Sequence, residues 1–246
     1  MSGFADLTVV VSGGSSGIGA AAADAFAERG ANVAVLDLNP SEKHWSTRCD
    51  VADDNQVRLA VAAVVERFGG VDVLVNNAGI GAVGTVEENS DKQWFRVLDV
   101  NVLGMVRLAR ACLPHLRESA SPAIVNTSSI VATTGLVNRA LYSASKGAVQ
   151  SLTMAMAADH VAEGIRVNCV NPGTADTPWV QRLLDQADDP AAERARLEAR
   201  QPTGRLVSAE EVANAIVYLG DPANKAVTGT SLAVDGGTAG LRIVKA

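Results

Sequence analysis

The stretch LTVVVSGGSSGIG, residues 7–19, decides the fold of this chain. A short continuous apolar run is followed by glycines and serines that open a helical pattern. A strand that turns through glycines into a helix presents free backbone N–H groups to an anion such as a phosphate. The pattern therefore predicts a phosphate-binding turn, made by Gly13, Ser15, Ser16, Gly17, Ile18 and Gly19. A purely structural turn between strand and helix is the open alternative.

Apolar runs and helical patterns alternate along the rest of the chain. The runs lie at 32–37, 71–77, 123–129, 165–171 and 231–235, with a shorter one at 45–50. Helical stretches run from the glycine turn to Arg29 and over 53–68, 91–117, 142–162 and 208–219. Strands that are apolar on both faces and alternate with helices indicate a parallel sheet covered on both sides. We expect one α/β domain over residues 1–246, with a doubly wound, Rossmann-like sheet of about seven strands.

Residues 174–207 interrupt this alternation. The segment is polar and helical in composition, and it separates the strand at 165–171 from the helix that starts at 208. A long insert beyond the carboxyl end of a strand is a candidate lid over a site. Its apolar positions either close over that site or pack permanently as core or subunit interface; they are Trp179, Val180, Leu183 and Leu184.

Composition narrows the class of protein. Hydrophobic residues make up 48% of the 246, charged residues 20%, and the formal net charge is −6. These values are typical of a soluble globular protein, and the negative charge argues against a nucleic-acid partner. The three cysteines and three histidines are scattered, so neither a disulfide framework nor a metal site is expected. No apolar run reaches the ~18 residues of a membrane span, and the first residues lack a signal-peptide pattern. We therefore expect a cytoplasmic protein.

Asp37 ends the second predicted strand. In dinucleotide-binding sheets a carboxylate at this place accepts hydrogen bonds from the adenosine ribose and repels a 2′-phosphate. Neither the loop at 14–18 nor the residues just after Asp37 contain Arg or Lys to bind that phosphate. These features predict NAD rather than NADP as the cofactor. Alternatively, Asp37 only ends the strand and begins a turn.

Tyr142 and Lys146 lie four residues apart in YSASK, on one face of a predicted helix. An isolated phenol has a pKa near ~10, and a fixed neighbouring cation lowers that pKa because it favours the phenolate. Tyr142 is therefore the candidate general base for alcohol oxidation and the candidate general acid for carbonyl reduction.

Taken in order, these motifs resemble the short-chain dehydrogenase/reductase family over nearly the whole chain. The matching elements are SGGSSGIG (12–19), Asp37, Asp50-Val51, NNAG (76–79), Asn101, Ser129, Tyr142-x-x-x-Lys146 and Pro172-Gly173 followed by Thr177. The chain departs from the family at Ser12, where threonine is usual, and between Asp37 and Asp50, where the short stretch leaves the usual helix truncated or missing.

The resemblance implies roles for several residues. Ser129 would hold the substrate oxygen, with the adjacent Ser128 as the competing choice, and Asn101 would position a water for proton relay. Tyr142 and Lys146 would also contact the cofactor. Asp50 and Val51 would border the adenine. Asn77, Ala78 and Gly79 would line the ribose, and Pro172, Gly173, Ala175 and Thr177 would surround the nicotinamide amide. Family members usually form homotetramers.

Arg139 and Arg200 indicate the class of substrate. In a subgroup that this sequence resembles, the type 2 (R)-3-hydroxybutyrate and 2-keto-3-deoxy-sugar-acid dehydrogenases, matching arginines hold the substrate carboxylate. Guanidinium groups suit that role because they bind carboxylates through a planar fork. We expect a small hydroxy acid or keto acid. Solvated or paired arginines are the alternative, in which case the substrate is a neutral sugar, a steroid or a 3-oxoacyl thioester. A nucleotide-binding regulator without catalysis is the alternative of another class.

Overall fold

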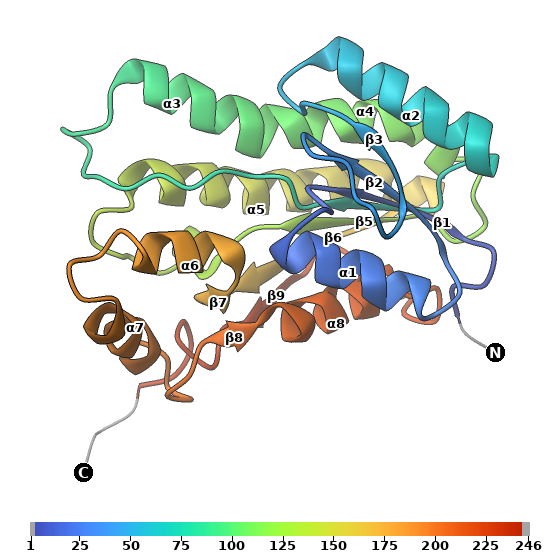
Figure 1. Ribbon diagram of the computed structural model, residues 1–246. Helices are drawn as coiled ribbons and strands as arrows, with labels where there is room; N and C mark the ends of the chain where they lie inside the picture. Colours follow the sequence, from blue (N-terminus) through green and yellow to red (C-terminus); the bar gives the residue numbers. More distant parts are fainter. Residues whose placement is uncertain (1–2, 243–246) are drawn as a thin grey trace.

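A seven-stranded, all-parallel sheet forms the centre of the computed structural model, which describes residues 3–242 (Figure 1). The strand order is β3-β2-β1-β4-β5-β6-β9. The strands are β1 (Thr8–Ser12), β2 (Asn32–Asp37), β3 (Trp45–Arg48), β4 (Val73–Asn76), β5 (Ala123–Thr127), β6 (Arg166–Pro172) and β9 (Ser231–Val234). The order reverses direction between β1 and β4, which places a crevice at the carboxyl ends of these two strands. The predicted doubly wound sheet of about seven strands is confirmed.

Helices cover both faces of the sheet (Figure 1). One face packs against α1 (Gly17–Ala27) and α8 (Ala209–Gly220), and the other against α2 (Asp54–Phe68), α4 (Gly104–Leu116) and α5 (Ala140–His160). In β1, Val9 and Val11 belong to the first core and Val10 to the second, because successive side chains of a strand point to opposite faces. Burial on both sides therefore explains the continuous apolar run at the start of the chain.

The helix predicted over 91–117 is not continuous. It consists of α3 (Asp91–Leu98), a π-helical turn (Asp99–Leu103) and α4. The prediction of one long helix was therefore wrong at its centre, where the wide turn contains Asn101. Single π-turns inside α-helices often occur at functional sites. Here the turn buries Asn101 completely and directs its side chain to the loop after β4.

No helix lies between β2 and β3, as the short stretch between Asp37 and Asp50 predicted. A loop takes its place and is attached to α1 by two contacts. Lys43 Nζ and His44 Nε2 each lie 2.7 Å from a carboxylate oxygen of Asp24. Leu38, the first residue of this loop, lines the crevice beside β2.

The insert at 174–207 folds as a small unit of its own. It contains β7 (Ala175–Asp176), α6 (Pro178–Leu184), α7 (Pro190–Ala199) and β8 (Val207–Ser208), and β7 pairs with β8 in parallel. Val180, Leu184, Leu197 and Leu206 are buried together between these elements. The predicted apolar stripe serves two purposes. Val180 and Leu184 belong to the core of the insert, and Trp179, Val180 and Leu183 line the crevice.

Candidate active site

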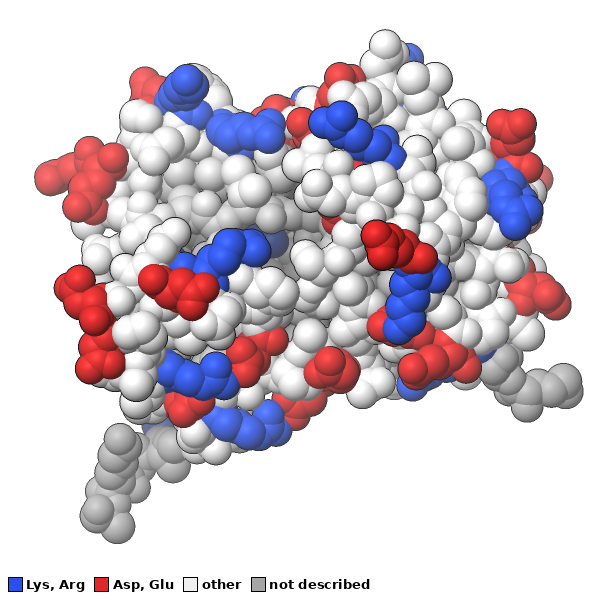
Figure 2. Space-filling model, viewed as in Figure 1, with Lys and Arg blue, Asp and Glu red and all other residues white. Residues whose placement is uncertain are grey.

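A cavity of about 400 Å³ opens at the carboxyl ends of the strands. Figure 2 shows this face hollowed, with basic side chains on both rims. Most predicted cofactor residues line it: Gly13, Ser16, Gly17, Ile18, Asp37, Asp50, Val51, Asn77, Ala78, Gly79, Tyr142, Lys146, Pro172, Gly173, Ala175 and Thr177. Ser129, Arg139 and Arg200 line the same cavity, whereas Ser15, Gly19 and Asn101 lie behind its wall. The structure therefore gathers most of the predicted site residues in one place.

The glycine turn is packed too closely for larger residues. A Cβ on Gly19 would lie 2.1 Å from the Gly13 carbonyl oxygen, and a Cβ on Gly13 would lie 2.9 Å from Ala78 Cα. Asn77 stabilises the turn, because its Nδ2 donates hydrogen bonds to the carbonyl oxygens of Ser12 and Gly13 at 3.3 and 3.1 Å. The Ser12 hydroxyl accepts from the Asn77 backbone N–H at 3.0 Å. The turn is thus held open by the end of the neighbouring strand β4, and its residues fit a bound diphosphate.

Asp37 is fixed at the rim of the cavity. Its Oδ2 accepts a hydrogen bond from the Ser15 backbone N–H at 3.2 Å, and its Oδ1 accepts one from the Asn39 backbone N–H at 3.0 Å. Ser15 therefore holds the Asp37 carboxylate and does not line the cavity itself. A carboxylate held in this way can accept further hydrogen bonds, because each oxygen has two lone pairs.

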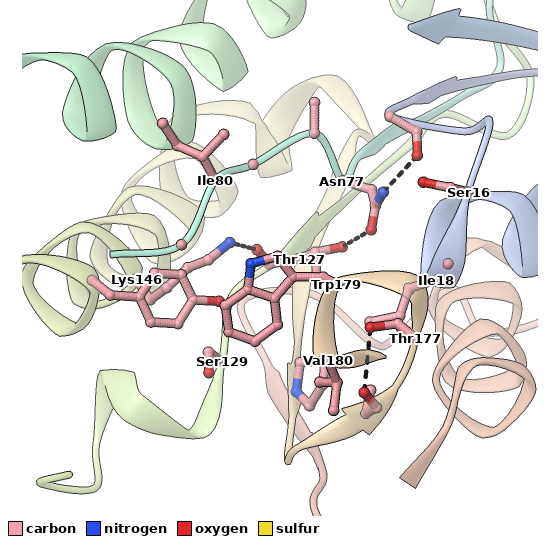
Figure 3. Close-up of a pocket in the computed structure, with 18 of the residues that line it drawn as sticks. Ser16, Ile18, Asn77, Ile80, Thr127, Ser129, Lys146, Thr177, Trp179 and Val180 are labelled. Carbon is pink, nitrogen blue, oxygen red and sulfur yellow. Dashed lines mark hydrogen bonds between the residues drawn. The ribbon is translucent and has the colours of Figure 1, made fainter. Parts of the chain in front are cut away.

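The segment after β6 also forms part of the wall. A Cβ on Gly173 would lie 2.8 Å from Gln201 Oε1, so only glycine fits without displacing that side chain. Thr177 Oγ1 donates to the Ala175 carbonyl at 3.3 Å (Figure 3). Thr177 lies at the start of α6, where its methyl group faces the glycine turn at Gly17.

Lys146 is almost completely buried beneath the cavity. Its Nζ donates to the backbone carbonyl of Thr127 at 2.8 Å (Figure 3) and lies 5.8 Å from the centre of the Tyr142 ring. Burial lowers the pKa of Lys146 to about 8, because the charged ammonium loses its hydration. The predicted proximity of Tyr142 and Lys146 is therefore present, at a distance typical of a cation beside an aromatic ring.

Burial affects the pKa of Tyr142 more than the neighbouring cations do. Burial raises the pKa of Tyr142, and a hydrogen bond with Ser129 and the positive charge of Arg139 only partly oppose this rise. The expectation that Lys146 lowers this pKa is corrected: the cation acting on the phenol is Arg139, and its effect is smaller than that of burial. A further positive charge in the cavity would lower this pKa and favour the phenolate.

The hydroxyl groups of the adjacent Ser128 and Ser129 point in different directions. Ser128 Oγ donates to the Lys146 backbone carbonyl at 2.9 Å, so that hydroxyl points into the protein. Ser129 lines the cavity and lowers the pKa of the Tyr142 phenol, and its Oγ accepts a hydrogen bond from the Val131 backbone N–H at 3.4 Å. Only Ser129 therefore presents its hydroxyl to the cavity next to the Tyr142 phenol.

Asn101 holds other residues in position. Its Nδ2 donates to the Ile80 carbonyl at 2.9 Å and to Ser145 Oγ at 3.1 Å, and its Oδ1 accepts from the Ile80 N–H at 2.8 Å. The side chain thus ties the loop after β4 to α5. Because all of its amide hydrogens are committed to the protein, its side chain has no donor left for a water.

Arg139 and Arg200 face the cavity without a carboxylate partner. Arg139 Nη1 donates to the Ala82 carbonyl at 3.3 Å, and neither arginine forms an ion pair within residues 3–242. Burial lowers the pKa of both, the nearby Arg196 lowers each further, and the negative charge of Glu193 partly opposes this fall. Glu193 forms its ion pair with Arg196. Arg139 and Arg200 therefore line the cavity without an ion pair of their own.

Several residues of the site were missed by sequence reasoning. Thr127 contributes a backbone carbonyl and Ile80 a backbone amide and carbonyl, which have no sequence signature. Arg96 and Arg182 line the cavity, but in the sequence they resemble ordinary surface residues. Only Trp179 carried a signal, as part of the apolar stripe of the insert.

Residues 3–242 contain neither a membrane-spanning helix nor a cluster of metal ligands. Among residues 3–242, none of the helices combines the length and the apolar character needed to cross a bilayer. Within the same residues, no group of three or more His, Cys, Asp and Glu side chains is placed to hold a metal ion.

Several known proteins that this chain resembles are named as dehydrogenases or reductases. A family model described as enoyl-(acyl carrier protein) reductase matches residues 13–239. The cis-4-hydroxycyclohexanecarboxylate dehydrogenase of Sinomonas cyclohexanicum is 41% identical over 247 residues, covering 95% of this chain and 97% of the relative. The ligand-free aldohexose dehydrogenase of Thermoplasma acidophilum superposes with a TM-score of 0.95 at 33% identity, covering 100% of this chain and 98% of that one. The 3-ketoacyl-(acyl-carrier-protein) reductase of Brucella melitensis, solved with NADH, has a TM-score of 0.87 at 31% identity, covering 96% of this chain and 99% of that one.

Proposed function

The chain belongs to the short-chain dehydrogenase/reductase family, and on that premise we propose that it interconverts a small hydroxy acid and its keto acid with NAD. As a member of the family it is a nicotinamide-dependent oxidoreductase that acts on CH–OH groups. The substrate proposal rests on Arg139 and Arg200, which line the same cavity as Tyr142 and form no ion pair within residues 3–242, since the nearby Glu193 is paired with Arg196.

The distribution of charge in the cavity supports an anionic substrate. Among the lining residues the structure describes, the only acids are Asp37, which ends β2, and Asp50, which follows β3. These two strands lie at the far edge of the sheet from the cavity wall that holds Tyr142. Partly buried cations without a partner are unfavourable, so a ligand that supplies a carboxylate is stabilised there. The relative from Sinomonas is named for a substrate that carries a carboxylate.

Replacing Arg139 with Ala tests the proposed carboxylate binding. We expect the KM for a carboxylate-bearing substrate to rise about 30-fold, because a charge-assisted hydrogen bond contributes roughly 2 kcal/mol. The KM for a neutral ketone should change far less, and steady-state kinetics with both substrates measures the difference. Equal changes for the acidic and the neutral substrate would contradict the proposal.

The cofactor proposal rests on the glycine turn and on Asp37. The turn from Gly13 to Gly19 would hold the diphosphate and Asp37 the adenosine ribose, while the segment from Pro172 to Thr177 would hold the nicotinamide amide. Bound nicotinamide would accept a hydride in alcohol oxidation and would donate one in carbonyl reduction. The choice of NAD over NADP follows from the fixed carboxylate at the rim, which would repel a 2′-phosphate.

The substitution Asp37→Ser tests the choice of cofactor. We expect kcat/KM with NAD to fall about 30-fold, because hydrogen bonds to a charged acceptor are lost, and kcat/KM with NADP to rise as the repulsion disappears. Initial rates with each cofactor give the ratio. A wild-type protein that already prefers NADP, or a ratio that is unchanged in the variant, would refute the assignment.

Tyr142 is the proposed proton donor and acceptor. In carbonyl reduction its phenol would give a proton to the substrate oxygen, which Ser129 would hold by a second hydrogen bond. In alcohol oxidation the phenolate would take that proton back. Arg139 would supply one positive charge near the phenol, and oxidised nicotinamide would add a second. Lys146 is held by the Thr127 carbonyl and lies 5.8 Å from the centre of the Tyr142 ring.

A neutral sugar is the second candidate substrate. It is favoured by the high similarity to the aldohexose dehydrogenase of Thermoplasma acidophilum, whose printed name is that of a sugar enzyme. The proton transfer at Tyr142 would be the same for both classes. A screen of hydroxy acids, sugar acids and neutral sugars with NAD separates the two candidates.

We also propose a homotetramer in the cytoplasm. Phe95 on α3, Leu103 in the π-turn and Met154 on α5 are large apolar side chains that remain substantially exposed in the single chain, with Phe95 at 73%. Association of the long helices would bury them. Light scattering in solution tests the mass. The three buried free cysteines suit a reducing compartment.

A further inference from the structure

The first residues of α6 cross the cavity from one wall to the other. Thr177 and Pro178 lie against the glycine turn, because a Cβ on Gly17 would be 3.5 Å from Thr177 Cβ and 3.8 Å from Pro178 Cδ. Trp179, the next residue, reaches the opposite wall at Gly81. Figure 3 shows the indole projecting from α6 toward the side of the cavity that holds Ile80 and Lys146.

The contact between Trp179 and Gly81 is close. A Cβ on Gly81 would lie 2.7 Å from Trp179 Cζ2 and 3.2 Å from Trp179 Nε1. Gly81 does not have the positive φ that favours glycine, so the space taken by the indole is the reason for its small size. Trp179 as a whole is 41% exposed, while its indole lies against Gly81 in the loop after β4.

The wall that Trp179 touches is held rigidly. Ile80 is bound on both its N–H and its carbonyl by Asn101. Ala82 accepts a hydrogen bond from Arg139, and the Gly84 N–H donates to the Asn138 carbonyl at 3.0 Å. A substrate too large for the cavity therefore cannot push this loop away easily. The indole of Trp179 is attached only through the start of α6, so it is the part of the cavity wall that can move.

We propose that Trp179 sets the maximum size of the substrate, by closing the space beside Tyr142 against Gly81. The inference rests on the proposed function, since it assumes that a substrate bound to Arg139 reacts at Tyr142. It adds that the substrate is short: a molecule with a bulky group next to the reacting carbon would meet the indole. Trp179 covers Gly81, and the next residue, Ala82, accepts the hydrogen bond from Arg139. Trp179 and Arg139 therefore form two walls of the same part of the cavity.

Two measurements test this inference. The first uses the W45F/W94F chain, in which Trp179 is the only tryptophan, and follows quenching of its fluorescence by acrylamide. The substitution Gly81→Ala should displace the indole and increase the quenching slope. Gly70→Ala is the matched control, because a Cβ there meets nothing within 4 Å and the slope should stay the same. An unchanged slope in the Gly81→Ala protein would overturn the proposed contact.

The second measurement compares a short keto acid with its phenyl-substituted analogue, using NADH. We expect Trp179→Ala to raise kcat/KM for the phenyl compound relative to the short one by about tenfold or more, the scale on which pocket size discriminates substrates. Gly81→Ala should shift the ratio the same way, and it should add little in the Trp179→Ala background. Trp179→Leu serves if the alanine variant does not fold.

The outcomes separate this inference from the proposed function. If the wild-type protein reduces the short keto acid and the ratio does not move in the Trp179 variants, the inference is wrong and the proposed function stands. If no keto acid is reduced, the proposed function is wrong, and the same comparison with a small and a phenyl-substituted neutral ketone decides the role of Trp179.

Discussion

Replacement of Tyr142 with Phe is expected to lower kcat by about 10³-fold or more, because a positioned acid or base contributes roughly 10²- to 10⁴-fold to a proton transfer. The change removes one oxygen and leaves the half-buried ring in place, so the fold and the binding of NADH should persist. Stopped-flow or steady-state rates measure the loss, and the fluorescence of bound NADH checks the second point. The chain has only one other tyrosine, Tyr218, which is exposed on α8. Tyr218→Phe is the matched control and should keep full activity.

The pH dependence supplies a second readout of the same group. Since burial raises the pKa of Tyr142, alcohol oxidation, which needs the phenolate, should accelerate as the pH rises toward that pKa. Carbonyl reduction, which needs the phenol, should slow over the same range. The Tyr142→Phe protein should lose this dependence along with its rate. Substantial residual turnover with an unchanged pH profile would remove Tyr142 from the proton transfer.

Replacement of Gly19 with Ala is expected to have the largest effect on the glycine turn. The new Cβ would lie 2.1 Å from the Gly13 carbonyl oxygen and 2.5 Å from Asn77 Nδ2. The first of these atoms belongs to the main chain and cannot turn aside, so the whole turn must move. We expect a destabilisation of about 3 kcal/mol, or roughly 6–12 °C in Tm. Thermal unfolding measures this loss, and titration with NADH should show binding weakened by about 100-fold or more, since 1.4 kcal/mol is tenfold.

Gly147→Ala is the control for this prediction. Gly147 also lies in a helix, but the nearest atom to its added Cβ is 3.9 Å away, so alanine fits. Its higher helix propensity should leave the Tm unchanged or raise it slightly. If Gly19→Ala unfolded at the wild-type temperature and bound NADH normally, the close packing of Gly13, Gly19 and Asn77 would not be what holds the turn in place.

Much of the fold could be predicted because its signals are local. The apolar run in β1 is continuous since both faces of that strand are buried, and the expected strands at 32–37 and 123–129 coincide with β2 and β5 within two residues. The π-turn at Asp99–Leu103 was not predicted. A π-turn and an α-helix of the same residues have nearly the same pattern of apolar positions, and the contact with Ile80 that accompanies the turn lies about twenty residues away in the chain.

The candidate site was predictable only in part. Tyr142 and Lys146 are one helical turn apart, so their proximity follows from spacing alone. Which cation lowers the pKa of the Tyr142 phenol depends on the burial and the hydrogen-bond acceptors of Lys146 and Arg139. The sequence pointed to Lys146, whereas the structure points to Arg139. The choice between Ser128 and Ser129 likewise depended on the neighbouring helix, where the Lys146 carbonyl accepts the Ser128 hydroxyl.

By itself, then, the sequence determined the order of strands and helices, the glycine turn after β1 and the pairing of Tyr142 with Lys146, because each depends on residues that are close in the chain. Only the tertiary structure decided which serine faces the cavity, that Arg139 and Arg200 line it without an ion pair, and that Trp179 meets Gly81. The Ser128–Lys146 hydrogen bond joins residues 18 apart in the chain, and the contact of Trp179 with Gly81 joins much more distant segments. Both arise when the parallel sheet brings its carboxyl ends to one edge.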